Sequence, residues 1–408
     1  LCIWEQNNIC PKEKTFIKLL VNLLLIIINV NIIDVLIDKP LWLIPLGFAI
    51  CFIIQMIYYL GIYSRIIFYK DGSPPKSYPP VSVIICARDE EANLEKNLPL
   101  ILEQEYPDFE VIVVNDSSTD NSDIVLKKIA QQYPNLRTTE IKKDEKFTHG
   151  KKLALTIGIK AAKHEYLLFT DADCFPETKH WIKEMMKNFD KDTSIVLGYG
   201  GYKHYPTLLN SLIRFDTVSI ALQYFSYALA GFPYMGVGRN LAYKKSLFFA
   251  NKGFAGHYHV ESGDDDIFIN QTANKNNTKT ELSPNAIIRS EPEKNWNDWL
   301  KQKRRHLTTA GFYKGTTKFC LGLEIFSRVL FYVFFVLSLI LFTKFHPYII
   351  GLFLVRYLIQ LIIYQKITKR LNEKYLLIVT LFYDIWLPFF NFMGIILNKI
   401  STRNNKWN

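Results

Sequence analysis

Apolar stretches long enough to cross a membrane lie toward both ends of the chain, and short apolar runs between polar segments fill its middle. Residues 41–63 carry no charge, and a helix of this length would be roughly 34 Å long, which spans a bilayer. Residues 16–37 are also apolar but include Lys18 and Asp34, so they are a weaker candidate. We therefore predict an N-terminal membrane region over residues 1–68.

The C-terminal part contains three further apolar stretches, at 323–343, 346–365 and 376–398. We predict that they form a second membrane region over residues 319–408. Asp384 and Pro388 interrupt the last stretch, which favours a tilted or re-entrant segment.

The middle of the chain predicts an α/β domain. Residues 69–80 contain Gly, Ser and four prolines, a composition typical of a linker. Apolar runs that favour strands then alternate with segments of helical pattern; the strands are expected at 81–86 and 111–114, and the helices at 91–104 and 120–133. Strands that alternate with helices indicate a parallel sheet, so we predict one such domain over residues 81–318.

One long apolar segment falls inside this domain. Tyr205–Phe232 contains few charges, among them Arg214 and Asp216. We predict an amphipathic helix that lies at the membrane face.

The charge balance helps to choose between partners. A net charge of +11 favours either nucleic acid or an anionic membrane face. The basic residues are dispersed and no nucleic-acid-binding module is recognisable, so we expect membrane lipids and no nucleic acid. Residues 366–374 carry four basic side chains between two apolar stretches, which favours the cytoplasmic side. The two preceding apolar stretches would cross the membrane twice between residues 81–318 and this loop, which places residues 81–318 on the cytoplasmic side too. We therefore predict a multi-pass protein of the cell (inner) membrane.

Acidic side chains provide the candidate chemistry. Asp171 and Asp173 follow the apolar run 166–169, which is expected to be a buried strand. Two carboxylates one residue apart at the carboxyl end of a strand form a hard-oxygen site that suits a divalent cation. A cation there can neutralise a departing diphosphate.

Three consecutive acids form a second cluster. Asp264, Asp265 and Asp266 crowd like charges together, which raises at least one pKa and suits a general base.

The order of these motifs resembles the family 2 glycosyltransferases. Val-Asn-Asp-Ser-Ser, Thr-Asp-Ala-Asp, Gly-Asp-Asp-Asp and Gln-x-x-Arg follow one another before the last apolar stretches. The likeness is greatest to the membrane-integrated branch that includes cellulose and hyaluronan synthases, and it covers roughly residues 40–400. It implies a GT-A fold, a Rossmann-like nucleotide-diphospho-sugar transferase domain, flanked by transmembrane helices.

The resemblance also implies where the donor binds. The turn after the first strand, with Ala87, Asp89 and Glu90, would meet the nucleotide base, although Asp89 stands where Asn is commoner. Asp116 would accept hydrogen bonds from the base or the ribose, and Lys151 would approach the phosphates or the sugar. Asp171 and Asp173 would hold Mg²⁺ or Mn²⁺ on the diphosphate.

The resemblance places the catalytic base at Asp265. A shift of one residue in register would move this role to Asp264 or Asp266.

The Gln-x-x-Arg motif gives the remaining candidates. Gln302 and Arg305 match it and would contact the diphosphate, whereas His306 replaces the usual Trp. His306 is a candidate acceptor contact that is expected to titrate near pH 6–7. Arg239, after a Gly-x-Gly, is a second candidate for the acceptor site.

These features predict an inverting, metal-dependent glycosyltransferase that moves a sugar from a nucleotide-sugar, expected to be a UDP-sugar, to a lipid-linked or saccharide acceptor. A processive polysaccharide synthase is the alternative. A non-catalytic membrane protein that binds sugar nucleotides is a remote one, because no metal or base carboxylate is lost. The donor sugar, the acceptor and the linkage stay open.

Overall fold

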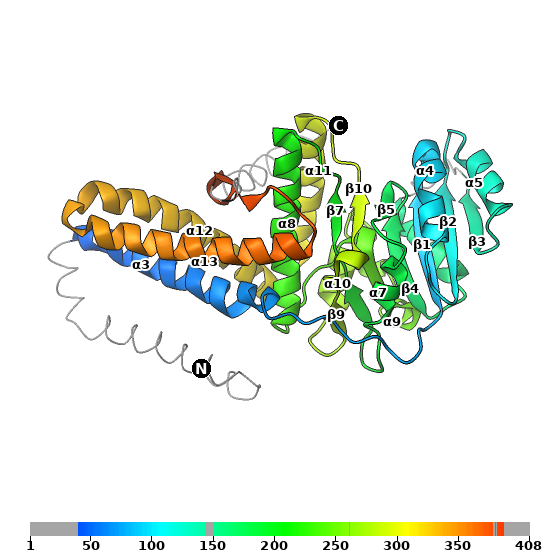
Figure 1. The fold of residues 1–408 in the computed structure, drawn as a ribbon, viewed down its shortest axis with the longest axis horizontal. Helices are drawn as coiled ribbons and strands as arrows, with labels where there is room; N and C mark the ends of the chain where they lie inside the picture. The colour runs from blue at the N-terminus through cyan, green and yellow to red at the C-terminus, as the bar shows by residue number, and fades with distance from the viewer. Residues whose placement is uncertain (1–39, 143–149, 261, 378–379, 381, 387–408) are drawn as a thin grey trace.

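A computed structural model describes residues 40–142, 150–260, 262–377, 380 and 382–386. The predicted stretch 16–37 and most of 376–398 lie outside these residues. An α/β domain joins a bundle of three long helices, and helix α8 (Leu208–Leu229) runs between the two parts (Figure 1).

The α/β domain is built on a mixed sheet of seven strands in the order β3-β2-β1-β4-β8-β6-β9. The strands β3, β2, β1 and β4 are parallel, and β8 runs antiparallel to both β4 and β6. A small second sheet has the order β5-β10-β7. The strands are β1 (Val81–Ala87), β2 (Phe109–Asp116), β3 (Leu136–Ile141), β4 (Tyr166–Asp171), β5 (Cys174–Pro176), β6 (Ile195–Leu197), β7 (Gly200–Tyr202), β8 (Leu241–Lys244), β9 (Thr278–Thr280) and β10 (Ile288–Ser290).

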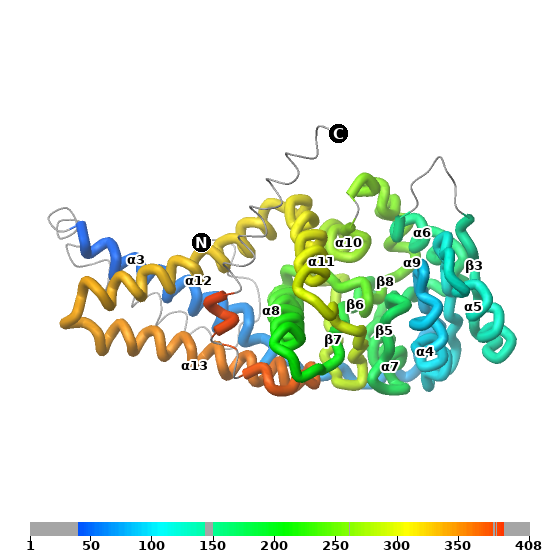
Figure 2. Tube along the Cα trace, turned by 90° about the horizontal axis from the view of Figure 1, so that it is seen from above, coloured from blue at the N-terminus to red at the C-terminus, as the bar shows by residue number. Residues whose placement is uncertain are grey.

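Helices cover both faces of the large sheet (Figures 1 and 2). The alternation of strand and helix predicted from the sequence is confirmed, with boundaries that move by one to three residues at most ends. Gly158 of α6 lies so close to the sheet that a Cβ there would be 2.8 Å from a methyl of Ile84. The helices besides α8 are α3 (Leu43–Met56), α4 (Glu91–Leu102), α5 (Ser122–Ala130), α6 (Lys151–Ala161), α7 (Trp181–Met186), α9 (Lys245–Ala250), α10 (Asp266–Thr272), α11 (Trp296–Thr309), α12 (Gly315–Leu341) and α13 (His346–Arg370).

Three helices of the described residues are long and apolar enough to cross a membrane, namely Pro40–Ile66, Gly315–Leu341 and Thr343–Arg370. They correspond to the predicted stretches 41–63, 323–343 and 346–365. The first and second pack closely, since a Cβ on Gly47 would be 2.7 Å from the ring of Phe334.

Charged side chains inside this bundle are paired with one another. Asp384 accepts from Arg356 at 2.9 Å and from Arg328 at 3.3 Å, and Arg328 also pairs with Glu324 one turn away. Arg356 is fully buried and also donates to Gln55 at 3.0 Å. Buried charges need partners of this kind in an apolar medium. The pairing explains how a charged Asp384 is accommodated in the last apolar stretch.

Helix α8 differs from its prediction. Most of its residues are buried, including the charged Arg214 and Asp216. It contacts β7 and β9 on one side and the ends of Pro40–Ile66 and α13 on the other. The predicted helix is confirmed, but the prediction that it is amphipathic is wrong, because neighbouring elements cover it on several sides. Its position at the membrane face stays a prediction.

Candidate active site

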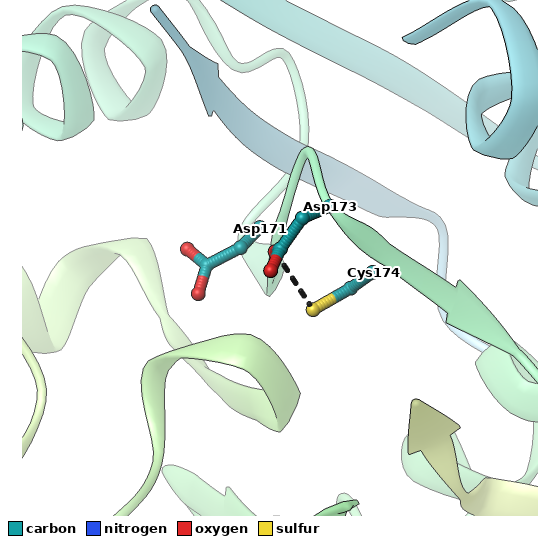
Figure 3. Close-up of side chains that lie close together, drawn as sticks. All are labelled: Asp171, Asp173 and Cys174. Atoms are coloured by element: carbon teal, nitrogen blue, oxygen red, sulfur yellow. Dashed lines mark hydrogen bonds between the residues drawn. The ribbon is translucent and has the colours of Figure 1, made fainter. Parts of the chain in front are cut away.

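The Asp-x-Asp motif lies where the sheet ends. Asp171 is the last residue of β4, and Asp173 stands in the tight turn that leads into β5 at Cys174 (Figure 3). One ligand atom from each of these three residues lies within 4.8 Å of the others. Burial and the neighbouring Asp171 carboxylate raise the pKa of Asp173. Charge crowding of this kind is relieved by a cation.

Two of these three side chains, those of Asp171 and Asp173, suit a hard cation. Carboxylate oxygens are the ligands that Mg²⁺ and Mn²⁺ prefer, whereas thiolates suit softer metals. Burial, followed by the charges of Asp173 and Asp171, holds the pKa of the Cys174 thiol well above its usual range. The thiol is therefore protonated, and it donates a weak hydrogen bond to Asp173 at 3.4 Å. Asp171 and Asp173 fit a divalent metal, and Cys174 orients one of them.

Lys151 links the Asp-x-Asp turn to the acidic triplet. It begins helix α6, and its ammonium lies 2.6 Å from Asp171 and 3.7 Å from Asp264. Burial raises the pKa of Asp171, but the charge and hydrogen bond of Lys151, followed by the charges of Arg239 and Arg305, outweigh it and lower this pKa overall. The structure thus brings together side chains that are far apart in the sequence.

The three acids of the triplet have different surroundings. Asp265 caps helix α10, accepting from the Asp266 N–H at 2.7 Å and also from the Gly238 N–H at 2.7 Å. Asp266 is buried and accepts hydrogen bonds from Tyr313 at 2.7 Å and from Thr309. These bonds fasten the end of α11 to α10.

Asp265 combines a shifted pKa with access to a cavity. Burial, followed by the charges of Asp264 and Asp266, raises the pKa of Asp265 to about 7. Asp265 borders a small cavity that also contains Lys151, Asp171 and Asp264. It also borders a second cavity of about 250 Å³ between α8, α11 and α12.

The turn after β2 leaves a buried acceptor available. Asp116 ends β2 and is 5% exposed, and its Oδ1 has no hydrogen-bond partner among the described residues. An unpaired buried acceptor is costly, so a ligand donor is expected there.

Side chains of the neighbouring turn after β1 form hydrogen bonds within the protein. Ala87 ends β1 and is buried. The side chain of Asp89 accepts from the N–H of Thr119 at 2.6 Å and from its hydroxyl at 3.0 Å. Glu90 accepts from Asn93 at 2.6 Å, and burial raises its pKa. Asp89 and Glu90 thus shape the turns beside Asp116.

Helix α11 carries the Gln-x-x-Arg motif along the second cavity. Gln302 borders this cavity and accepts from the Tyr202 hydroxyl at 3.3 Å. Arg305 is exposed, and its charge helps to lower the pKa of Asp171. Lys303 donates to both oxygens of Asp216 on α8, at 2.7 and 2.6 Å. This ion pair, which the sequence pattern does not indicate, fixes α11 against α8.

Two side chains proposed for the acceptor also border the second cavity. The guanidinium of Arg239 lies 4.3 Å from the centre of the Tyr202 ring and donates to Ser290 at 2.9 Å. The side chain of Arg239 has room because residue 200 is Gly, where a Cβ would clash with it. The sequence analysis did not identify Tyr202, because an isolated aromatic residue gives no sign that its ring will pack against an arginine.

His306 does not titrate where the sequence predicted. Desolvation, followed by the charges of Arg305, Arg239 and Lys303, lowers its pKa to about 4. The His306 side chain is partly open to solvent, so desolvation does not act alone, and the three cations shift the pKa in the same direction. The prediction of a charge change near pH 6–7 is wrong, and His306 presents a neutral ring to the cavity.

The sequence and the fold can be compared with known proteins. Residues 82–232 match the model of a domain described as Glycosyl transferase family 2. The chain is 29% identical over 138 residues to a poly-beta-1,6-N-acetyl-D-glucosamine synthase of Staphylococcus epidermidis, covering 32% of this chain and 31% of the relative. It is 24% identical over 241 residues to the probable glycosyltransferase YdaM of Bacillus subtilis, covering 56% and 55%. The chain thus matches 31% and 55% of the length of these two relatives.

One solved structure shares the fold over most of the chain. It is a mannosyltransferase from Pyrobaculum calidifontis in complex with GDP-Man and Mn²⁺. The TM-score is 0.54 at 19% identity, over 85% of this chain and 99% of the other. The likeness supports the predicted GT-A-like α/β fold.

Proposed function

We propose that this chain, which carries a family 2 glycosyltransferase domain, moves a sugar from a nucleotide-sugar to an acceptor at the membrane, with inversion at the anomeric carbon. The observation that carries the proposal is the position of Asp265. Its carboxyl group stands between the cavity at the Asp-x-Asp turn and the cavity that extends toward the membrane helices. A base that removes a proton from an acceptor must lie at such a boundary between donor and acceptor.

The donor would bind on the side of the Asp-x-Asp turn. Asp171 and Asp173 would hold Mg²⁺ or Mn²⁺, and the ion supplies positive charge to the diphosphate that leaves. Lys151 and Arg305 would add cations on the same group. The unpaired Oδ1 of Asp116 would accept from the base or ribose. A UDP-sugar is the expected donor.

Lys151 would change partners when the donor binds. Its ammonium now neutralises Asp171 at 2.6 Å. Lys151 would leave Asp171 if this carboxylate held a divalent ion, because like charges repel. The freed ammonium is then available to the donor phosphates.

Asp265 would carry out the proton transfer. The acceptor hydroxyl gives its proton to the carboxylate as its oxygen forms a bond to the anomeric carbon, and the bond from that carbon to the diphosphate oxygen breaks. A pKa of about 7 matches this task, since the ideal base titrates near the working pH. Asp266 is a poorer candidate because Thr309 and Tyr313 already bond its carboxylate. Asp264 is the remaining alternative.

The acceptor cavity favours a lipid-linked acceptor. Gln302, Lys303 and His306 form its polar wall near Asp265. The lining also includes apolar side chains, among them Ile213 and Ile220 of α8 with Leu321 and Ile325 of α12; α12 is one of the helices long enough to cross a membrane. A sugar-bearing lipid would place its polar end at Asp265 and its apolar part along α12.

A processive polysaccharide synthase is the second candidate. A smaller cavity shares Asp216, Ile220 and Gln223 with the second cavity and continues to Arg328 and Tyr364 among the long helices. This polar continuation would suit a growing saccharide.

The location follows from the same elements. We propose that the three long helices cross the cell membrane with the α/β domain on the cytoplasmic side, where nucleotide-sugars are made. The basic side chains between 366 and 374 support this orientation.

The test is incubation of membranes that contain the full chain with a panel of labelled nucleotide-sugars, with Asp265→Asn membranes as the control. Label that enters a lipid extract supports the first candidate, and label in a polymer supports the second. No transfer above the Asp265→Asn control, with any donor, would refute the proposed activity.

A further inference from the structure

A further cavity adjoins the second cavity at Tyr202 and contains none of the acidic side chains of the proposed active site. It has a volume of about 480 Å³ and is bordered by three separate parts of the chain. These are the small sheet with its edges, the start of α8, and the turn that follows α13. The lining residues are Phe175, Glu177, Tyr202, Lys203, His204, Arg214, Arg289, Asn372, Lys374 and Tyr375.

The wall of this cavity, which we call the basic pocket, carries an excess of positive charge. Four cationic side chains line it against one carboxylate, Glu177. Arg214 and Arg289 both pair with the buried carboxylate of Glu373, which lies outside the lining, and Arg289 also pairs with Glu177 at 2.8 Å. The two guanidiniums are thus balanced by two carboxylates. Lys203 pairs with Glu291 at 2.8 Å, so the excess charge of the lining is that of Lys374. Lys374 is exposed at its rim.

Aromatic rings accompany these cations. The Lys203 ammonium lies 5.5 Å from the centre of the Phe175 ring, and the His204 ring lies 5.7 Å from that of Tyr375. Tyr375 is 75% exposed and has a φ of +66°. A bulky residue seldom adopts this backbone conformation, which is strained. The turn therefore keeps an aromatic ring at the rim at an energetic cost.

The pocket's place along the chain indicates what binds there. Asn372, Lys374 and Tyr375 follow within five residues of Arg370, the end of the apolar helix α13. If α13 crosses the membrane, this turn lies at the level of the lipid headgroups, which extend several ångströms beyond the hydrocarbon. Tyrosine rings and basic side chains are typical of that level.

We propose that the basic pocket binds the phosphate headgroup of an anionic membrane lipid. Lys374 and Lys203 would contact the phosphate, and Tyr375 would lie against the glycerol or upper acyl region. Tyr202 borders both this pocket and the active-site cavity. A bound headgroup would thus lie beside the ring that supports Arg239.

The test measures lipid binding without sugar transfer, so it can fail independently of the proposed activity. The full chain in neutral detergent is titrated with dioleoyl-phosphatidylglycerol or dioleoyl-phosphatidylcholine, and retained lipid is counted by native mass spectrometry. The variant is Lys374→Gln, whose exposed side chain makes loss of folding easy to exclude by thermal unfolding. The matched control is Lys369→Gln, an exposed lysine at the same end of α13 that does not line the pocket.

We expect selective retention of phosphatidylglycerol. Lys374→Gln should weaken it about fivefold, the effect of one lysine near an anionic headgroup, and Lys369→Gln should change it less than about twofold. Equal weakening by both variants, or no preference over phosphatidylcholine, would overturn the proposal. A third arm adds glycerol 3-phosphate as competitor. Displacement of the lipid at equal concentration would assign the pocket to a soluble phosphate instead.

Discussion

The raised pKa of Asp265 makes the pH profile of transfer the most informative test of its surroundings. A base must be ionised to act, and with a pKa of about 7 the ionised share is about one tenth at pH 6, half at pH 7 and nine tenths at pH 8. The rate of transfer at saturating donor should therefore rise about ninefold from pH 6 to pH 8 and then level off. His306, with a pKa near 4, stays neutral throughout this range.

Asp264→Asn should move this profile in a known direction. After burial, the Asp264 charge is the largest cause that raises the pKa of Asp265. The change removes that charge, and it also frees Lys151 from a carboxylate 3.7 Å away, so that its ammonium further favours an ionised Asp265. Both effects lower the pKa. The ratio of the rate at pH 6 to the rate at pH 8 should rise from about 0.1 to above about 0.5, because each unit of pKa changes the ionised share at pH 6 up to tenfold.

The assay follows initial rates of label transfer from pH 5.5 to 8.5, with Asp192→Asn as the control. Asp192 is exposed and borders neither cavity, so the same chemical change there should leave the profile in place. The ratio compares two rates of the same variant, at pH 6 and at pH 8, so a lower maximal rate does not change it. A midpoint that stays near 7 in Asp264→Asn, or shifts upward, would refute the reasoning.

Three further predictions follow from other contacts. Asp173→Ala should abolish the Mn²⁺-dependent part of nucleotide-sugar binding in calorimetric titrations, and unchanged affinity would contradict the metal assignment. Lys303→Met should lower the free energy of unfolding in denaturant by about 3–5 kcal/mol, because it leaves the buried Asp216 charge unpaired. The control Lys301→Met, at an exposed ion pair, should lower it by less than about 1 kcal/mol. Equal losses in the two variants would argue against the ion pair between α8 and α11. In intact cells, with native cysteines replaced, Lys344→Cys between α12 and α13 should react with an impermeant thiol reagent and Asp192→Cys should not; the reverse result would invert the proposed topology.

The sheet and the long helices could be predicted because their signals are local. Short runs such as 81–86 and 111–114 pair as central parallel strands, and uncharged stretches such as 41–63 form long helices. Helix α8 was misjudged because its charged residues find partners that no local pattern reveals. Arg214 pairs with Glu373 and Asp216 pairs with Lys303, each across more than 80 residues of sequence.

The candidate site also combines features that the sequence reveals with features that only the fold creates. The carboxylates at Asp171 and at 264–266 were found because strand ends and acidic runs are visible in the sequence. What separates the three acids is not visible, since it depends on hydrogen bonds from Gly238, Thr309 and Tyr313. The low pKa of His306 likewise depends on desolvation and on the cations that the fold brings around it. The division of roles within the site stays a prediction until variants are measured.

The central claim is that Asp265 acts on the acceptor and not on the donor. The direct test is Asp265→Asn in the purified full chain, with nucleotide-sugar affinity and the rate of transfer to acceptor measured on one preparation. The account predicts donor affinity within about twofold of wild type and a rate lower by about 10²–10⁴. Transfer near the wild-type rate, or a loss of donor binding that matches the loss of rate, would contradict it.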